Sequence, residues 1–144
     1  MKKSAAVLLK KTEAVRSITK QEYVTLASFR YRLRQFLKYS ESAAKKAGLS
    51  AKQHQALLSV KGHRESDAIT IGKLAEHLQI AHHSAVGLVN RLTAKKLLIR
   101  RTSVEDARQV YVSVSASGER ILGKLTSSHK EELRRLSIEF NSKA

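Results

Sequence analysis

A short segment in the second half of the chain carries side chains of the types that recognise nucleic-acid bases. Within residues 81–94, the apolar residues Ala85, Leu88, Val89 and Leu92 recur at three- and four-residue spacing, which predicts a helix with one buried face. Helical geometry then turns the polar residues outward. Asn can pair with adenine and Arg with guanine through two hydrogen bonds, while Ser and His donate to bases or phosphates. The candidate major-groove contacts are His82, His83, Ser84, Gly87, Asn90 and Arg91.

Two features of this segment have their own interpretation. His82 and His83 can equally be solvated residues at a helix start. Gly87 lies inside the predicted helix, where glycine costs about 1 kcal/mol relative to alanine. We therefore expect a DNA backbone or base to approach closely at Gly87.

A second group of polar residues lies at the tip of a predicted hairpin, between strands expected at 97–102 and 109–114. A long, permanently charged side chain at such a tip suits the narrow, strongly negative minor groove, so Arg108 is the candidate contact there. Asp106 has no attraction for DNA, and we expect it to orient Arg91 or Arg108 or to form an Asx turn. The alternative for both residues is a solvated turn.

Four further cations flank the hairpin, and they are interpreted as phosphate contacts that position the protein without reading sequence. They are Lys95, Lys96, Arg100 and Arg101. The alternative is that some of them only complement the negative end of a helix dipole.

The elements that must position these residues are mostly helical. A long amphipathic helix is predicted over about 19–47, closed by Gly48, and Ser50 with Gln53 forms a capping-box pattern that opens a second helix ending at Gly62. After a polar loop at 63–68, Thr70 caps a short third helix that precedes the segment at 81–94. A final helix is expected over about 115–140. A helix-turn-helix followed by a β-hairpin is a winged helix, so the predicted class is mainly α with a small β-hairpin wing.

Charge points to the class of partner. The chain of 144 residues has 28 Lys and Arg against 12 Asp and Glu, a formal charge of +16. A strongly basic folded domain indicates nucleic acid first, then an anionic membrane or an acidic protein. The alternative is a merely soluble basic surface. Residues 51–80 are nearly neutral, and the flanking segments are basic. We find no signal peptide or membrane-spanning segment, so we expect a cytoplasmic protein without a membrane partner.

Several other classes of chemistry are not predicted. The absence of cysteine excludes a disulfide scaffold, a thiolate zinc site and a thiol redox sensor. No pair among His54, His63, His77 and His129 has the i, i+4 spacing of a helical metal clamp. There is no glycine-rich phosphate loop, nucleophile elbow or carboxylate pair, so we expect no enzyme activity and no cofactor.

The order of elements and three stretches of sequence resemble the MarR family of bacterial transcription regulators over about residues 20–140. The segment Ile71–Leu78 (IGKLAEHL) is similar to the first helix of the family's DNA-binding unit. His82–Leu92 (HHSAVGLVNRL) resembles its recognition helix, in a His-His-Ser variant. Asp106–Arg108 (DAR), with Val112–Ser115 and Gly118 after it, is similar to the family's wing and its exit into the next helix.

The resemblance implies a homodimer whose terminal helices interlock and place two winged helices on an inverted repeat, often with a ligand crevice. The charge of the first segment sets a basic arm apart at 1–18, and the resemblance assigns 19–144 to a winged-helix domain. The DNA-binding unit then spans about 50–114, between dimerisation helices at about 19–47 and 115–142. Lys96 stands where the family often has Gly, so a different helix end is expected there. The sequence runs only to Ala144, and we expect dimerisation to rely on the first helix and the arm.

The leading hypothesis is a sequence-specific regulator, a repressor, that binds double-stranded DNA as a homodimer. One alternative is a non-specific architectural nucleic-acid-binding protein, and another is a module that binds an acidic protein. Aromatic residues of the first helix are candidates to line a crevice for a small aromatic effector, although such residues are more often core or dimer interface. They are Tyr23, Phe29, Tyr31, Phe36 and Tyr39.

Overall fold

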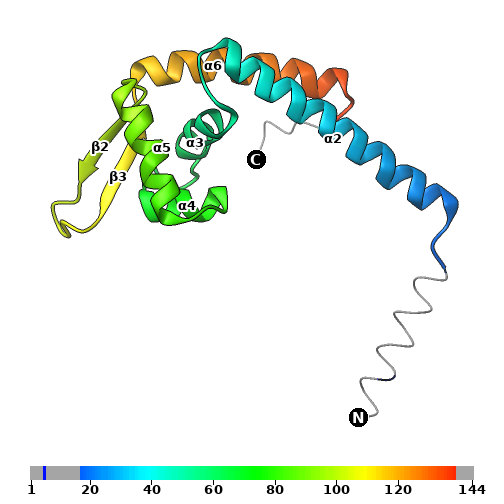
Figure 1. Cartoon of the computed structure of the whole chain (residues 1–144), viewed down its shortest axis with the longest axis horizontal. Helices are drawn as coiled ribbons and strands as arrows, with labels where there is room; N and C mark the ends of the chain where they lie inside the picture. The colour runs from blue at the N-terminus through cyan, green and yellow to red at the C-terminus, as the bar shows by residue number, and fades with distance from the viewer. Residues whose placement is uncertain (1–4, 6–16, 139–144) are drawn as a thin grey trace. The chain divides into compact units, whose positions relative to one another are not determined.

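The computed structural model describes residue 5 and residues 17–138 (Figure 1). The elements in chain order are α2 (Lys20–Lys46), α3 (Ala51–Lys61), β1 (Ala68–Thr70), α4 (Ile71–Leu78), α5 (His82–Ala94), β2 (Leu98–Thr102), β3 (Val110–Val114) and α6 (Ala116–Arg135). The chain divides into two compact units, Met1–Leu37 and Lys38–Ala144, with the boundary inside α2. The predicted class, mainly α with a β wing, is confirmed. The basic arm predicted at 1–18 falls almost entirely outside the described residues.

Side chains start most of these helices as the sequence predicts. Ser50 forms the full capping box, because its hydroxyl accepts from the Gln53 backbone N–H while the Gln53 side chain accepts from the Ser50 N–H. Thr70 accepts from the Lys73 N–H and starts α4. Helix α5, the predicted recognition helix, begins after Ala81 with no side-chain cap. Three N–H groups at that end therefore remain available to an external acceptor such as a phosphate.

Four helices end in the same backbone motif, in which one residue takes a left-handed conformation and two N–H groups turn back to carbonyls of the last turn. Gly48 supplies this residue after α2. The corresponding residues after α4, α5 and α6 are Gln79, Lys96 and Ser137, with φ of 55°, 61° and 56°. The prediction that α5 ends differently at Lys96 is therefore wrong. Lysine adopts the conformation that glycine adopts most easily.

The sheet has one more strand than the sequence predicts. Its order is β1-β3-β2, fully antiparallel, with Ile69 opposite Val112 and Arg100 also opposite Val112 on the other side. β1 lies where a polar loop ending at Ala68 was expected. It has only three residues, too few to show a period of two. It closes the base of the wing onto the start of α4.

The last helix is shorter than the predicted 115–140. It ends at Arg135, and the turn at Leu136–Ser137 hydrogen-bonds back to Glu132 and Arg134. The periodic residues beyond it misled the prediction, because a left-handed residue at Ser137 breaks the helix whatever follows. Phe140, expected at its end, is outside the described residues.

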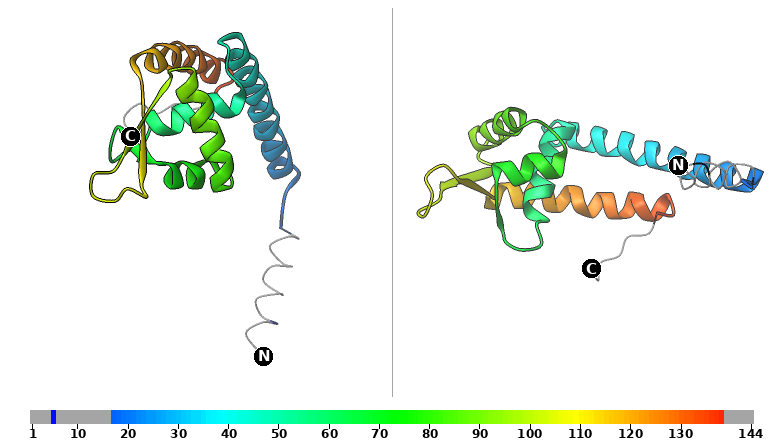
Figure 2. Two further views of the ribbon diagram at one scale, coloured as in Figure 1. Left: turned by 60° about the vertical axis from the view of Figure 1, so that its left-hand side comes forward. Right: turned by 90° about the horizontal axis from the view of Figure 1, so that it is seen from below.

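The core lies within the unit Lys38–Ala144, where α3, α4, α5 and the sheet meet (Figure 2). Its largest fully buried side chains are Leu57, Val60, Ile69, Leu74, Val89, Leu92 and Val112. The hairpin β2–β3 extends beyond this core, past the ends of α4 and α5. In the part of the chain that the structure describes, no helix is both long and apolar enough to span a membrane.

Candidate nucleic-acid interface

The predicted orientation of α5 agrees with its burial. Ala85, Leu88, Val89 and Leu92 are buried in the core. On the other side, His82, His83, Ser84, Asn90 and Arg91 are exposed, and Gly87 is half-buried. A polar face of this kind, on a helix fixed by four core residues, can enter a groove of DNA without disturbing the fold.

Gly87 leaves open space on this face. A Cβ atom added there would meet only the Arg91 Nη1 atom, at an ordinary contact distance of 3.7 Å. Nothing inside the protein therefore requires glycine at this position. The expectation that an external molecule approaches here stays a prediction.

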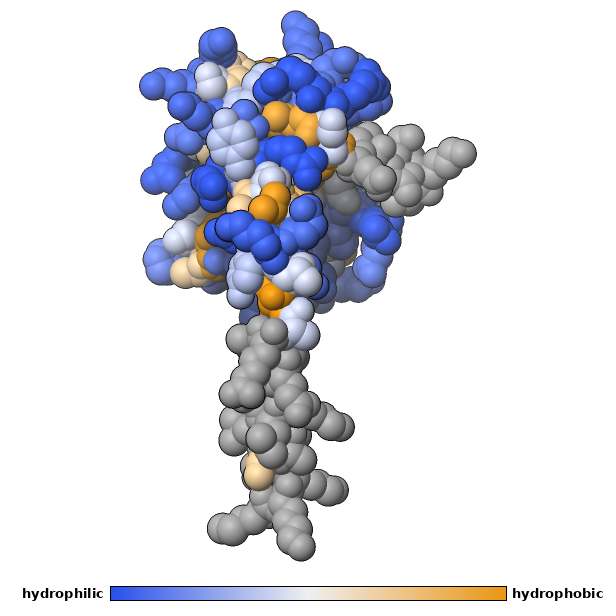
Figure 3. Space-filling view, turned by 90° about the vertical axis from the view of Figure 1, so that its right-hand side faces the viewer, coloured by the Kyte–Doolittle hydropathy of each residue, from blue (hydrophilic) through white to orange (hydrophobic). Residues whose placement is uncertain are grey.

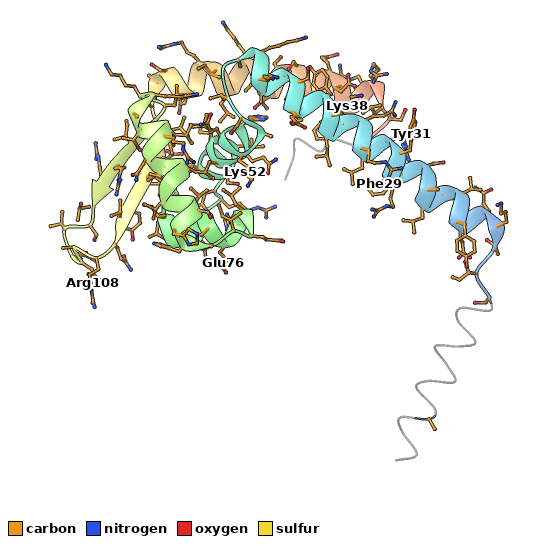
Figure 4. The ribbon with its side chains drawn as sticks, in the orientation of Figure 1. Phe29, Tyr31, Lys38, Lys52, Glu76 and Arg108 are labelled. Carbon is orange, nitrogen blue, oxygen red and sulfur yellow. The ribbon has the colours of Figure 1, made fainter. Side chains whose placement is uncertain are left out.

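The tip of the wing is organised around Asp106. Its Oδ1 accepts from the backbone N–H of Arg108 at 3.0 Å and from the Arg108 Nε at 3.2 Å. Ser103 accepts from the backbone N–H groups of Glu105 and Asp106 on the other side of the loop. Of the roles expected for Asp106, the structure places it beside Arg108 and in an Asx turn. The Arg108 side chain is 92% exposed and projects from the tip (Figure 4).

The four flanking cations have different surroundings. The Lys95 ammonium donates to the Gly48 carbonyl at 2.7 Å and to Gln53 Oε1 at 3.3 Å, which ties the end of α5 to the start of α3. Lys96 is exposed at the left-handed helix end. Arg101 is exposed on β2, opposite Tyr111. The Lys95 ammonium has three N–H donors, so one remains for a phosphate while the other two hold Lys95 in place.

Arg100 connects the wing to the recognition helix. Its Nη1 donates to the side-chain carbonyl of Asn90 at 2.5 Å. Arg100 and Arg108 also line a hollow of about 360 Å³ between the wing, α5 and the start of α4, together with His82 and Thr70. Three of the predicted site residues thus meet around one cationic hollow.

Comparison with known proteins agrees with this geometry. Residues 47–109 match the sequence model of the MarR family. The resemblance to the MarR family is confirmed. The matched segment contains α3, α4, α5, β2 and the tip of the wing, and it ends just before β3. The match does not test whether the chain belongs to a His-His-Ser subgroup, and that assignment stays a prediction. No curated protein matches at the level of sequence alone.

Solved MarR-family structures share the fold over most of the chain. AbsC, a MarR family transcriptional regulator from Streptomyces coelicolor, is 17% identical with a TM-score of 0.68, over 88% of this chain and 84% of that one. The S. aureus MepR–DNA complex is 21% identical with a TM-score of 0.65, over 88% of each chain. Wild-type MarR from E. coli in its apo form is 16% identical with a TM-score of 0.66, over 87% of each chain. At these identities the likeness shows the fold.

The MarR-type fold also fixes how α6 leaves the wing. The Ser115 backbone N–H donates to the Leu97 carbonyl at 3.0 Å, and its hydroxyl donates to the Lys96 carbonyl at 2.7 Å. A Cβ atom at Gly118 would lie only 2.4 Å from the Leu97 carbonyl oxygen. The glycine noted in the MarR-like exit motif is therefore needed for close approach of α6 to the turn after α5.

The aromatic residues proposed for an effector crevice are spread along α2. Tyr23, Phe29 and Tyr31 are largely exposed, and Phe36 and Tyr39 are half-buried. A hollow of about 500 Å³ lies elsewhere in the MarR-type fold, between α3 and α6, and none of these aromatics lines it. The effector crevice stays a prediction.

Sequence reasoning missed a buried pair of histidines. His54 on α3 and His129 on α6 are both buried, with ring centroids 4.9 Å apart. Burial, with a smaller contribution from the nearby His129, lowers the pKa of His54. The Nδ1 atom of His54 is buried without a hydrogen-bond partner. Among the described residues, no three His, Cys, Asp or Glu side chains gather so that they could hold a metal ion. The two residues are 75 positions apart, and no local pattern indicates their contact.

Proposed function

We propose that this protein is a sequence-specific, double-stranded DNA-binding transcription regulator that acts as a homodimeric repressor on a pseudo-palindromic operator. The observation that carries the proposal is the pairing of an exposed polar face on α5 with a wing whose tip presents Arg108 to solvent. In a winged helix, the exposed helix face suits the major groove, and the wing tip suits the adjacent minor groove. The proposed regulator needs no catalytic step and no cofactor. We place it in the cytoplasm.

Charge and relatives support DNA as the partner. The net charge of +16 attracts a polyanion, and a MepR structure of the same fold was solved as a DNA complex. Within the site, we assign base contacts to His83, Ser84 and Arg91, and a minor-groove contact to Arg108. His82 and Lys96 are assigned to phosphates.

An exposed apolar stripe on α2 supports a second copy of the chain as a further partner. Figure 3 shows hydrophobic side chains exposed among hydrophilic ones on the face that it draws. The stripe comprises Tyr23, Leu26, Phe29, Leu33 and Leu37, which are between 37% and 60% exposed. A contiguous apolar surface of this kind is typical of an interface. Two copies joined along this helix would present two recognition helices to half-sites about one turn of DNA apart.

One experiment tests the proposal directly. Sheared bacterial genomic DNA is retained on the purified protein at physiological salt, and the retained fragments are sequenced. We expect an enriched inverted repeat. Binding to that repeat should be about a thousandfold or more tighter than to unrelated DNA. Mass measurement by light scattering should give two chains.

The strong positive charge also favours a second candidate, a non-specific architectural protein. It would bind with a steep salt dependence and almost no sequence preference, because counterion release alone would drive association. Retention of DNA without a shared motif would favour this candidate. No retention at physiological salt would reject both and indicate an acidic protein as the partner.

A further inference from the structure

The contact between Asn90 and Arg100 changes the role that its position on α5 predicts for Asn90. We propose that Asn90 is a positioning residue, which holds the Arg100 guanidinium beside the recognition helix so that Arg100 binds a DNA backbone phosphate at the junction of α5 and the wing. This inference rests on the proposed DNA-binding function and deepens it. It replaces the prediction that Asn90 reads a base.

The wing places Arg100 on the correct face. Side chains alternate along a strand, so Arg100 lies on the same face of β2 as Leu98, which is buried in the core. Directly opposite Arg100 in the sheet is Val112, also buried. Arg101 lies on the other face, opposite Tyr111. Two adjacent arginines of β2 therefore point to opposite sides of the wing, and Arg100 is the one directed toward α5.

Hydrogen-bonding capacity separates the two possible roles of Asn90. Pairing with adenine needs both groups of the amide, with Oδ1 accepting from the base N6 and the nitrogen donating to N7. The Oδ1 atom already accepts from Arg100 Nη1 at 2.5 Å. A guanidinium has five N–H donors in a fixed plane, so the bond to Asn90 leaves four of them for another acceptor. The Asn90 amide nitrogen keeps its own two N–H donors, but pairing with adenine would also require Oδ1 to accept from the base while it is bonded to the Arg100 guanidinium.

The surroundings of Arg100 match a phosphodiester. The hollow that Arg100 lines also has His82, Arg108 and Thr70 on its walls and no carboxylate among its lining residues. Asp106, a carboxylate of the wing tip, is engaged by Arg108. Guanidinium groups bind phosphate oxygens with two parallel hydrogen bonds when the plane of the group is held in place. Asn90 supplies that restraint from the recognition helix.

The two roles predict different losses in the variant Asn90→Ala. If Asn90 positions Arg100, affinity falls about threefold for every DNA sequence, because Arg100 must then be ordered during binding. The order of preference among operator variants does not change. If Asn90 reads a base, the preference at one base pair of each half-site is lost while the other positions keep theirs.

The test is a double-mutant cycle measured on the selected operator and on a set of duplexes with single base-pair changes. The variants are Asn90→Ala, Arg100→Ala, the double variant, and the matched control pair Asn90→Ala with Arg101→Ala. We expect Arg100→Ala to weaken binding about tenfold and to reduce the slope of log affinity against log salt by about 1. Adding Asn90→Ala to Arg100→Ala should cost nothing further, whereas its effect should add fully to that of Arg101→Ala.

Thermal unfolding of each variant without DNA controls for stability, and it should change little because both side chains are exposed. A loss of base preference in Asn90→Ala, or full additivity between Asn90→Ala and Arg100→Ala, would overturn the inference. If the unmodified protein shows no preferred sequence, the proposed regulator is rejected. The cycle can then still be measured on any duplex, so the two failures remain distinct.

Discussion

His54 and His129 pack against each other at the point where α3 meets α6. His129 also donates from Nδ1 to the Leu125 carbonyl at 2.6 Å, since a carbonyl can only accept. Its Nε2 is hydrogen-bonded to the Ser40 hydroxyl, which lies 2.8 Å away on α2. Tyr39 packs edge-on against the same ring. One buried histidine thereby joins α2, α3 and α6.

The stability of the fold should therefore fall in mild acid. His54 has a lowered pKa in the folded protein, so below about pH 6.5 the unfolded chain takes up a proton that the folded chain resists. The free energy of unfolding should decrease as pH falls, by up to about 1.4 kcal/mol per pH unit for this group. Chemical denaturation between pH 8 and pH 5 measures the slope.

The variant His54→Leu isolates this contribution. It should flatten the slope between pH 7 and pH 5, while His77→Asn, an exposed histidine on α4, should leave it unchanged. The other titratable group near the pair is Glu132, whose pKa is lowered, away from this window, by its hydrogen bond to Arg135. An equal slope in His54→Leu and the unmodified protein would contradict the prediction.

Gly87→Ala should separate stability from DNA binding. The added methyl fits the free protein, so helix propensity should raise stability by about 1 kcal/mol. If DNA approaches α5 closely there, operator affinity should fall at the same time. Gly123→Ala in α6, where a Cβ also meets nothing, is the matched control and should raise stability alone. Unchanged affinity in Gly87→Ala would refute the close approach.

Gly118→Ala should lower the stability of the fold. Its methyl would overlap the Leu97 carbonyl and the Val114 side chain, at 2.4 and 2.7 Å. We expect a loss of about 1 to 3 kcal/mol, as for other overpacked sites. Thermal unfolding beside Gly123→Ala gives the comparison, and a melting temperature equal to that of the unmodified protein would show that α6 can shift away at no cost.

Lys96→Gly should stabilise the fold. The left-handed conformation costs a side chain about 1 kcal/mol, and glycine avoids that cost. Because Lys96 is also a candidate phosphate contact, the variant should melt higher and bind DNA more weakly with a smaller salt slope. Gln79→Gly, at the equivalent helix end of α4, should give the gain in stability without a change in salt slope.

Arg108→Ala should weaken operator binding about tenfold, since the proposed minor-groove contact loses its exposed cation. Asp106→Ala should have a smaller effect in the same direction, because Arg108 keeps its charge and loses only its orientation. Fluorescence anisotropy with the selected operator measures both. An Asp106→Ala variant that binds more tightly would show that its negative charge outweighs its orienting role.

The sequence predicts the parts of this fold that depend on local pattern. Ser50 and Thr70 cap the expected helices, and the periodicity of Ala85, Leu88 and Leu92 gives the buried face of α5. β1 and the early end of α6 were not predicted, because the former is a product of pairing with β3 and the latter of one left-handed residue.

The site was predicted as a set of residues but not as an arrangement. Asp106 beside Arg108 follows from spacing in a tight turn. Side chains alternate between the two faces of β2 from Leu98 onward, so the sequence alone could have placed Arg100 and Arg101 on opposite faces. The contact between Arg100 and Asn90, in contrast, depends on how the wing packs on α5. Lys95 looks like its neighbour in the sequence, and only the fold reveals its bonds to Gly48 and Gln53.

The hydrogen bonds from Ser115 to the carbonyls of Lys96 and Leu97 join the start of α6 to both the end of the recognition helix and the base of the wing. The start of α6 cannot shift away from the end of α5 or from the base of the wing without breaking one of these hydrogen bonds. We therefore expect a ligand that displaces the start of α6 to displace the end of α5 and the base of the wing with it.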